Sequence, residues 1–304
     1  LNIEAQIEAE RFEEGVLLEA IVRYQDAFIA STAVAVTRKQ VNLQIDVCSN
    51  PGEHEWSLHS WSPENPQLYD LELRIIKDGK PEDTVLSYFG MRDIRIDGRQ
   101  ILLNGSPLYQ RLILDQGYWE DSHLTPPDEA ALIEDIEKIQ KLGYNGVRKH
   151  QKIEDERFLY WCDVKGLLVW SEMAAAYTFD DTAVSDFMTQ WAEIVRQNYS
   201  HPAIITWTPV NESWGVPQIK TEKQQQSFAQ AIYYLTKSLD PYRPVIVNDG
   251  WEHTVSDIIT LHDYEEKGSV FLERYAEHIQ ELLDGTIYHN LDRAAFADGF
   301  SYHG

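Results

Sequence analysis

Two patterns of apolar and polar positions divide the chain. Up to about residue 95, short runs such as 16–22 and 41–47 alternate apolar and polar side chains, and turn-like clusters such as 49–52 separate them. Alternation at every second residue is typical of strands with one buried face. The pattern predicts a β-sandwich domain over residues 1–95.

The period of the apolar positions changes after a hairpin, whose tight turn we place at Asp97-Gly98. A helix should then begin at a capping box of Thr125 and Asp128 and end at Gly143. Its buried face is predicted to consist of Leu132, Ile136, Ile139 and Leu142.

Strands and helices alternate from there onward. About six strands are expected, at residues 108–114, 146–150, 167–172, 203–210, 244–249 and 258–264. This order is typical of a parallel (β/α)8 TIM barrel or of a doubly wound sheet. No glycine-rich phosphate loop follows the first strand, which favours the barrel. We therefore predict an incomplete TIM barrel over residues 96–304, with about six of its eight strands.

Polar side chains gather at the carboxyl ends of these strands, the edge where such barrels bind ligands. The clearest case is the apolar run that starts at residue 203 and stops at Asn211 and Glu212. Glu212 is therefore the first catalytic candidate, and the alternative is that this pair only caps the next helix or faces water. The other strand ends carry Asp115, Arg148, His150, Glu172, Asn248, Asp249, His262 and Tyr264.

Carboxylates, an amide, imidazoles and indoles, without thiolates or a phosphate loop, suit the cleavage of a glycosidic bond. Glu212 would protonate the leaving oxygen, and a neighbouring acid or an apolar wall such as Trp207 or Trp214 would raise its pKa. Glu172 is the candidate for a second carboxylate. Alternatively, Glu172 is structural and bonds an arginine or histidine at the same edge. No cofactor and no metal site is predicted.

Composition narrows the choice of partners. The 304 residues carry a formal charge of −24, which would repel nucleic acid and anionic membranes, and no apolar run approaches the roughly 20 residues that span a bilayer. Cys48 and Cys162 lie far apart and in no metal-binding spacing, which favours a reducing, cytoplasmic location. We expect a small carbohydrate as the partner, and exposed barrel edges would allow a homo-oligomer.

Six short motifs follow one another along the chain: WSPENPQLY at 61–69, FGMR at 89–92, LLNG at 102–105, NGVR at 145–148, VNES at 210–213 and DPYRPV at 240–245. In this order they resemble the signatures of glycoside hydrolase family 2, which includes β-galactosidases, β-glucuronidases and β-mannosidases. The resemblance covers almost the whole chain. It implies an immunoglobulin-like sandwich, then a catalytic barrel, and a retaining mechanism.

By position, the resemblance implies that Glu212 is the general acid/base, that Asn211 bonds the sugar 2-hydroxyl and that Tyr264 bonds the nucleophile. Segments 115–119 and 148–153 depart from the family pattern, which leaves the sugar and any divalent cation open. A β-galactosidase is expected first and a β-glucuronidase next. The predicted substrate contacts besides Asn211 are Asp115, Trp119, Arg148, His150, Trp214 and His262.

The nucleophilic glutamate of the resembled family ends the seventh barrel strand, which would start just past Gly304. We therefore expect a fragment that lacks the nucleophile and has no retaining glycosidase activity by itself. Two alternatives stay open. One is a non-catalytic carbohydrate-binding or scaffold protein on a degenerate barrel. The other is an inverting hydrolase that pairs Glu172 with Glu212, whose carboxylates would lie about 6.5–9.5 Å apart instead of about 5–5.5 Å.

Overall fold

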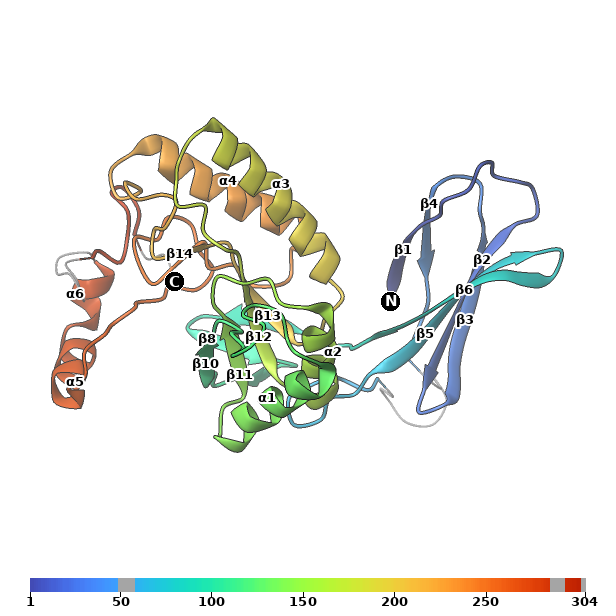
Figure 1. Cartoon of the computed structure of the whole chain (residues 1–304), viewed down its shortest axis with the longest axis horizontal. Helices are drawn as coiled ribbons and strands as arrows, with labels where there is room; N and C mark the ends of the chain where they lie inside the picture. The colour runs from blue at the N-terminus through green and yellow to red at the C-terminus, as the bar shows by residue number, and fades with distance from the viewer. Residues whose placement is uncertain (49–57, 285–292, 302–304) are drawn as a thin grey trace. The chain divides into compact units, whose positions relative to one another are not determined.

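The computed structural model describes residues 1–48, 58–284 and 293–301. The chain divides into two compact units, Leu1–Arg92 and Asp93–Gly304, and each is described by itself (Figure 1). The boundary predicted at residue 95 lies three residues after this division. The turn predicted at 49–52 falls outside the described residues.

The first unit is a β-sandwich, as the alternating pattern predicts. Its strands are β1 (Asn2–Gln6), β2 (Leu17–Tyr24), β3 (Ala27–Ala35), β4 (Gln40–Gln44), β5 (Tyr69–Lys77) and β6 (Lys80–Phe89). β1 pairs with β4, and the order β3-β2-β5-β6 forms a four-stranded antiparallel sheet. Leu18, Ala20 and Val22 of β2 are buried at every second position. They share one core with Val41 and Leu43 of β4, whose apolar positions alternate, whereas Ile21 of β2 is also buried but lies outside this core.

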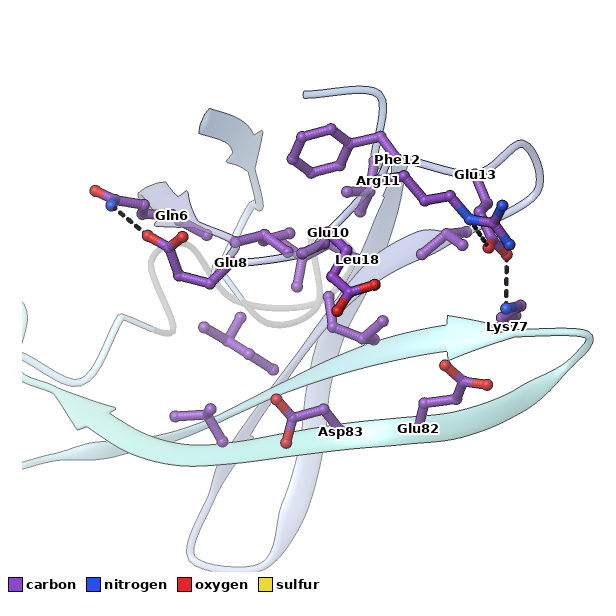
Figure 2. Close-up of a pocket in the computed structure, with 18 residues that line it drawn as sticks. Gln6, Glu8, Glu10, Arg11, Phe12, Glu13, Leu18, Lys77, Glu82 and Asp83 are labelled. Atoms are coloured by element: carbon purple, nitrogen blue, oxygen red, sulfur yellow. Dashed lines mark hydrogen bonds and ion pairs between the residues drawn. The ribbon is translucent and has the colours of Figure 1, made fainter. Parts of the chain in front are cut away.

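A groove of about 840 Å³ lies within this sandwich, between the 7–16 segment and the sheet. Its floor is apolar and includes Leu18, Val36, Leu73, Ile75 and Val85. Figure 2 shows the carboxylates of Glu82 and Asp83 on β6 facing the segment that carries Glu10. An ion pair of 2.6 Å between Lys77 Nζ and Glu13 Oε2 joins β5 to this segment.

The second unit begins with a hairpin and continues as a partial parallel barrel. The hairpin strands are β7 (Ile94–Asp97), β8 (Gln100–Leu103) and β9 (Ser106–Pro107), and Gly98 takes the positive φ that its tight turn requires. The parallel strands are β10 (Leu112–Asp115), β11 (Gly146–Lys149), β12 (Leu168–Glu172), β13 (Ile204–Thr208), β14 (Val210–Asn211) and β15 (Asn248–Asp249). β10 to β13 form one sheet, and β14 pairs with β15.

Helices and parallel strands alternate through most of this unit, as predicted, and the last two helices follow one another with no strand between them. They are α1 (Glu129–Lys141), α2 (Glu156–Lys165), α3 (Asp181–Asn198), α4 (Lys223–Leu239), α5 (Gly268–Glu277) and α6 (Ile279–Leu283). Phe187, Trp191 and Val195 form the buried side of α3. Within the described ranges, no helix is long and apolar enough to cross a membrane.

The predicted start of α1 is wrong by one turn. The helix begins at Glu129, and Asp128 caps it by accepting a hydrogen bond of 2.8 Å from the Ala131 amide. A residue that precedes proline is disfavoured in helical conformation, so the Pro126-Pro127 pair delays the start and Thr125 is not the cap. Leu142, predicted on the buried face, is 71% exposed.

The sixth strand predicted at 258–264 is not a strand. This segment runs beside residues 245–250, and Asp257 and His262 donate backbone hydrogen bonds to Val245 and Gly250. The backbone donors of that neighbouring stretch are instead taken by side chains: Val245 donates to Asp257 Oδ2, Val247 to Ser256 Oγ and Gly250 to Thr260 Oγ1. Because these side chains occupy the donors, a regular ladder cannot form.

A buried ion pair ties the turn after α4 to β13. Arg243 Nη1 donates to Asp240 Oδ2 over 2.6 Å, and the Trp207 indole donates to the same oxygen over 2.8 Å. The remaining guanidinium nitrogens donate to the backbone carbonyls of Tyr199, His201 and Ile204. Four of the five N–H donors of this buried arginine are thus paired with protein acceptors.

We expect Arg243→Met to lower the free energy of unfolding by about 3–5 kcal/mol, because it leaves the Asp240 carboxylate buried without its cation. Urea unfolding followed by tryptophan fluorescence measures this loss. The matched control is Arg157→Met, which removes an exposed ion pair with Asp155 and should change the midpoint little. Equal losses for the two variants would contradict a structural role for the buried pair.

Candidate active site

Most of the polar residues predicted at strand ends meet at one edge of the barrel because their strands are parallel and in register. Arg148 is level with Leu114 of β10 and Trp170 of β12, and Asn211 of β14 pairs with Asp249 of β15. A joined cluster results, in which consecutive contacts link Arg148, His150, Glu172, Asn211, Glu212, Asp249, His262 and Tyr264.

Arg148 is the centre of this cluster and is only 8% exposed. Its Nε lies 2.6 Å from Asp249 Oδ2, and its Nη2 lies 2.7 Å from Glu172 Oε2 and 2.5 Å from Asn211 Oδ1. One guanidinium therefore fixes side chains from β12, β14 and β15. A buried carboxylate is stable only when such a partner compensates the loss of water.

Glu172 is fully buried and is held on both oxygens. Besides the Arg148 contact, its Oε1 lies 2.8 Å from His150 Nδ1 and accepts a hydrogen bond of 2.9 Å from the Gln151 amide. The sequence left two interpretations of Glu172 open, a second catalytic carboxylate or a structural one. These contacts with an arginine and a histidine of the same edge match the structural interpretation. Through His150 and the Gln151 amide, the Glu172 carboxylate holds the loop that follows β11.

Glu212 lies on a strained turn directly after β14. Glu212 and Ser213 both have positive φ, +48° and +57°, a conformation that costs about 1–3 kcal/mol per non-glycine residue. Neighbouring residues hold the turn: the Glu212 amide donates to Asp249 O, the Ser213 amide to Asn248 Oδ1, and Ser213 Oγ to Glu252 Oε2.

The Glu212 carboxylate receives two donors on the same oxygen. His262 Nδ1 lies 2.7 Å from Oε1, and the Tyr264 hydroxyl donates to that atom as well. Burial raises the pKa of Glu212, but the hydrogen bonds from His262 and Tyr264 outweigh burial and lower the pKa overall. Within the described residues, Oε2 has no such donor.

This result corrects the prediction that an indole wall or a neighbouring acid would raise the pKa of Glu212. Trp207 is buried in the barrel, where its indole bonds Asp240. Trp214 is 48% exposed, and its ring lies 5.6 Å from the ring of Tyr177. Both indoles are close to Glu212 along the chain, but their side chains make contacts elsewhere.

His262 lies between two carboxylates. Its Nδ1 contacts Glu212, and its Nε2 lies 3.3 Å from Asp249 Oδ2. Burial lowers the pKa of His262, but its hydrogen bonds to Asp249 and Glu212 outweigh this and raise the pKa to about 9. Burial and the bond to Glu212 raise the pKa of the Tyr264 hydroxyl to about 12. At neutral pH the site therefore holds an imidazolium, a neutral phenol and a glutamate anion.

Asp115 and Trp119 belong to a different set of contacts. Lys149 Nζ lies 2.6 Å from Asp115 Oδ2 and 2.5 Å from Glu154 Oε2, and Lys152 Nζ also lies 3.1 Å from Glu154 Oε1, so two lysines compensate the two acids. Trp119 exchanges backbone hydrogen bonds with His123. No described contact joins Asp115, Trp119 or Trp214 to Glu212, so their predicted roles in substrate binding stay predictions.

The sequence predicted Asp249 at a strand end but not as a site residue, and it did not predict the ion pair of Lys149 and Glu154. The signal for Asp249 was present, because it ends the strand that follows the Glu212 strand. Lys149 and Glu154 gave no such signal, since their pairing depends on how the loop after β11 folds back. Within the described residues, no group of three His, Cys, Asp or Glu side chains could hold a metal ion.

A hollow of about 520 Å³ adjoins the cluster. Its polar side is formed by Gln110, Arg148, Asp249, Thr260 and His262. Its apolar side includes Leu108, Leu112, Leu114, Trp170, Ile258 and Leu261. An apolar hollow with a few convergent polar groups is the usual form of a small-molecule site.

Known proteins with similar sequences include several β-glucuronidases. The β-glucuronidases of Sus scrofa and Homo sapiens are each 26% identical over 230 residues, which cover 70% of this chain and 34% of theirs. The chain thus spans about a third of the length of these curated relatives. None of these names supports the expectation that a β-galactosidase comes first.

Solved structures with a similar fold include a β-galacturonidase and a β-glucuronidase. A β-galacturonidase of Eisenbergiella tayi bound to galacturonate superposes with a TM-score of 0.64 at 26% identity, covering 77% of this chain and 41% of that one. A β-glucuronidase of Bacteroides uniformis superposes with a TM-score of 0.68 at 23% identity, covering 80% and 30%. The second likeness supports the fold: a sandwich followed by a barrel.

Two family models match consecutive parts of the chain. The model described as glycosyl hydrolases family 2 matches residues 25–92, and the TIM barrel domain of the same family matches residues 94–284. The barrel match alone spans more than half of the chain, and both agree with the motifs and the fold. The chain belongs to glycosyl hydrolase family 2.

Proposed function

We propose that this chain carries the acid/base half of a retaining β-glycosidase, with Glu212 as the general acid/base. The observation that supports this most is the carboxylate geometry of Glu212. A strained turn presents it at the carboxyl edge of the barrel, and two donors engage one of its oxygens while the other stays available. Positive φ at two successive residues is costly, and such strain is typical of functional sites.

The first step requires the protonated form of Glu212, which takes its proton from solvent and is the minor form at neutral pH because the pKa of Glu212 is lowered. In that form Oε2 gives the proton to the leaving oxygen as the glycosidic bond breaks, and the carboxylate that forms is stabilised by His262 and Tyr264. In the second step the same carboxylate takes a proton from the attacking water. Asn211 is 1% exposed, and its Nδ2 has no partner among the described residues. This free donor suits the sugar 2-hydroxyl, as the family resemblance implies.

The nucleophile is proposed to come from another segment of the whole protein. Glu172 and Asp249 are both held by the Arg148 guanidinium, and their side chains are 0% and 2% exposed. A carboxylate that is buried and ion-paired is a poor nucleophile for a sugar that must reach it from solvent. Tyr264, expected to bond the nucleophile, donates to Glu212 instead, so it would have to exchange partners when a second carboxylate is present.

For the substrate we propose a terminal β-linked uronic acid, on the support of the glucuronidase and galacturonidase names among similar proteins. One observation favours a neutral sugar such as galactose as a second candidate. A uronate carboxylate needs a cation, and the described cations at the strand ends, Arg148, Lys149 and Lys152, already pair with carboxylates. A cation that binds the uronate would therefore have to be shared with one of these carboxylates or come from another segment of the whole protein.

We expect Glu212→Gln in the whole protein to reduce kcat/KM by about 10²–10⁴-fold on substrates with poor leaving groups. Activated aryl glycosides should lose much less, because their leaving groups need little protonation. Steady-state kinetics on both substrate classes measure the difference. Glu193→Gln is the control, since Glu193 is an exposed carboxylate on α3. Equal losses on both classes would reject Glu212 as the acid.

We expect the whole protein to prefer aryl β-glucuronide or β-galacturonide over aryl β-galactoside by about 100-fold in kcat/KM, because a cation that binds the uronate is left unpaired by the neutral sugar. Kinetics on the three substrates test this, and the anomer first released, followed by proton NMR, tests retention. A preference for galactoside would support the second candidate. An inverted product would support the inverting alternative, and no turnover on any of the three would support a non-catalytic binding protein.

A further inference from the structure

The ring of His262 rests directly on the backbone of Gly250. A β-carbon added at Gly250 would overlap His262 Cγ, Nδ1 and Cδ2, so no larger residue fits beneath the ring. Gly250 also has a φ of +92°, which favours glycine by itself. The residue directly after Asp249 therefore makes room for the imidazole that Asp249 contacts.

The backbone on both sides of the ring is held as well. The Gly250 amide donates to Thr260 Oγ1 over 2.8 Å, and the His262 amide donates to Gly250 O over 3.2 Å. These bonds replace the ladder of the missing strand and fix the segment from 260 to 262 against the end of β15. The position of the imidazole is therefore set by the backbone and not only by its two carboxylate partners.

We propose that His262 is a positioning residue. Gly250 leaves room for its imidazolium between Asp249 and Glu212. His262 therefore always contacts Glu212 Oε1, and only Oε2 exchanges a proton. This role rests on the proposed acid/base function of Glu212. It replaces the predicted role of His262 as a substrate contact. His262 would act through Glu212 and never touch the sugar.

The charges around the imidazole support this role. Asp249 and Glu212 face it from the ends of β15 and β14 and favour its charged form, whereas Arg148 of β11 disfavours it. Tyr264, two residues on, shares the same Glu212 oxygen but stays neutral. Because an imidazolium stabilises the carboxylate, it makes Glu212 a stronger acid in the first step and a weaker base in the second.

The first test is a titration of the His262 ring by NMR in this chain, with His262→Gln to identify its signal among the ten histidines. We expect a midpoint near 9. Gly250→Ala should displace the ring and return the midpoint toward 6.5. The matched control is Gly143→Ala, which has nearly the same φ, +90°, but open space around the added carbon. A wild-type midpoint near 6.5, or equal midpoints for the two alanine variants, would overturn the proposal.

The second test is the pH dependence of thermal unfolding. A histidine whose pKa rises on folding adds stability that is complete below the unfolded pKa of 6.5 and is lost as the pH rises to about 9. His262→Gln should keep a donor to Glu212 but remove the difference in unfolding temperature between pH 6.5 and pH 9 that His262 supplies. An unchanged pH dependence would overturn the proposal, and this test remains decisive if Gly250→Ala does not fold.

The pH profile of the whole protein separates the two proposals. If both hold, His262→Gln raises the pKa of Glu212 and moves the alkaline limb of kcat/KM to higher pH. If His262 titrates near 9 but Glu212→Gln leaves the kinetics unchanged, the proposed acid/base function of Glu212 is wrong, whereas the proposed position of His262 between Asp249 and Glu212 is retained. If Glu212→Gln is damaging but His262→Gln leaves the limb in place, the inference about His262 is wrong.

Discussion

The site depends on one buried cation. Arg148 is the only described guanidinium in the cluster, and Asn211, Glu172 and Asp249, which come from three different strands, each contact it. A carboxylate removed from water is stable only with a compensating partner, so Arg148 allows two acids to lie inside the barrel edge. The positions of the remaining groups follow, because Asp249 in turn contacts His262 and His262 contacts Glu212.

Three carboxylates with the same chemistry acquire different roles from their surroundings. Glu172 is enclosed by Arg148, His150 and a backbone amide, and serves to hold a loop. Asp249 is also buried, and the bonds from His262 and the charge of Arg148 outweigh burial and keep its pKa low. Glu212 alone combines partial exposure with an oxygen free of donors. Environment, and not residue type, thus selects the residue that can exchange a proton.

Stabilising contacts and backbone strain lie in different parts of the barrel. The pair of Arg243 and Asp240 and the packed helices hold the strands, whereas the two residues with positive φ at 212 and 213 store strain at the edge. Such strain persists only where neighbours fix it, here through bonds to Asp249, Asn248 and Glu252. The scaffold thus offsets the cost of presenting Glu212.

The sequence by itself determined the two-part fold, the alternation of strands and helices, and Glu212 with Asn211 and Arg148 as neighbours, because apolar periodicity and strand ends are local properties. Local patterns failed where side chains compete with the backbone, as at 258–264, and where two prolines delay a helix. Only the tertiary structure decided that Glu172 is buried and paired with Arg148 and His150, and that His262 lowers the pKa of Glu212 while both indoles lie apart from it. These outcomes depend on which groups from distant segments meet at the edge, and on whether burial or a hydrogen bond dominates there.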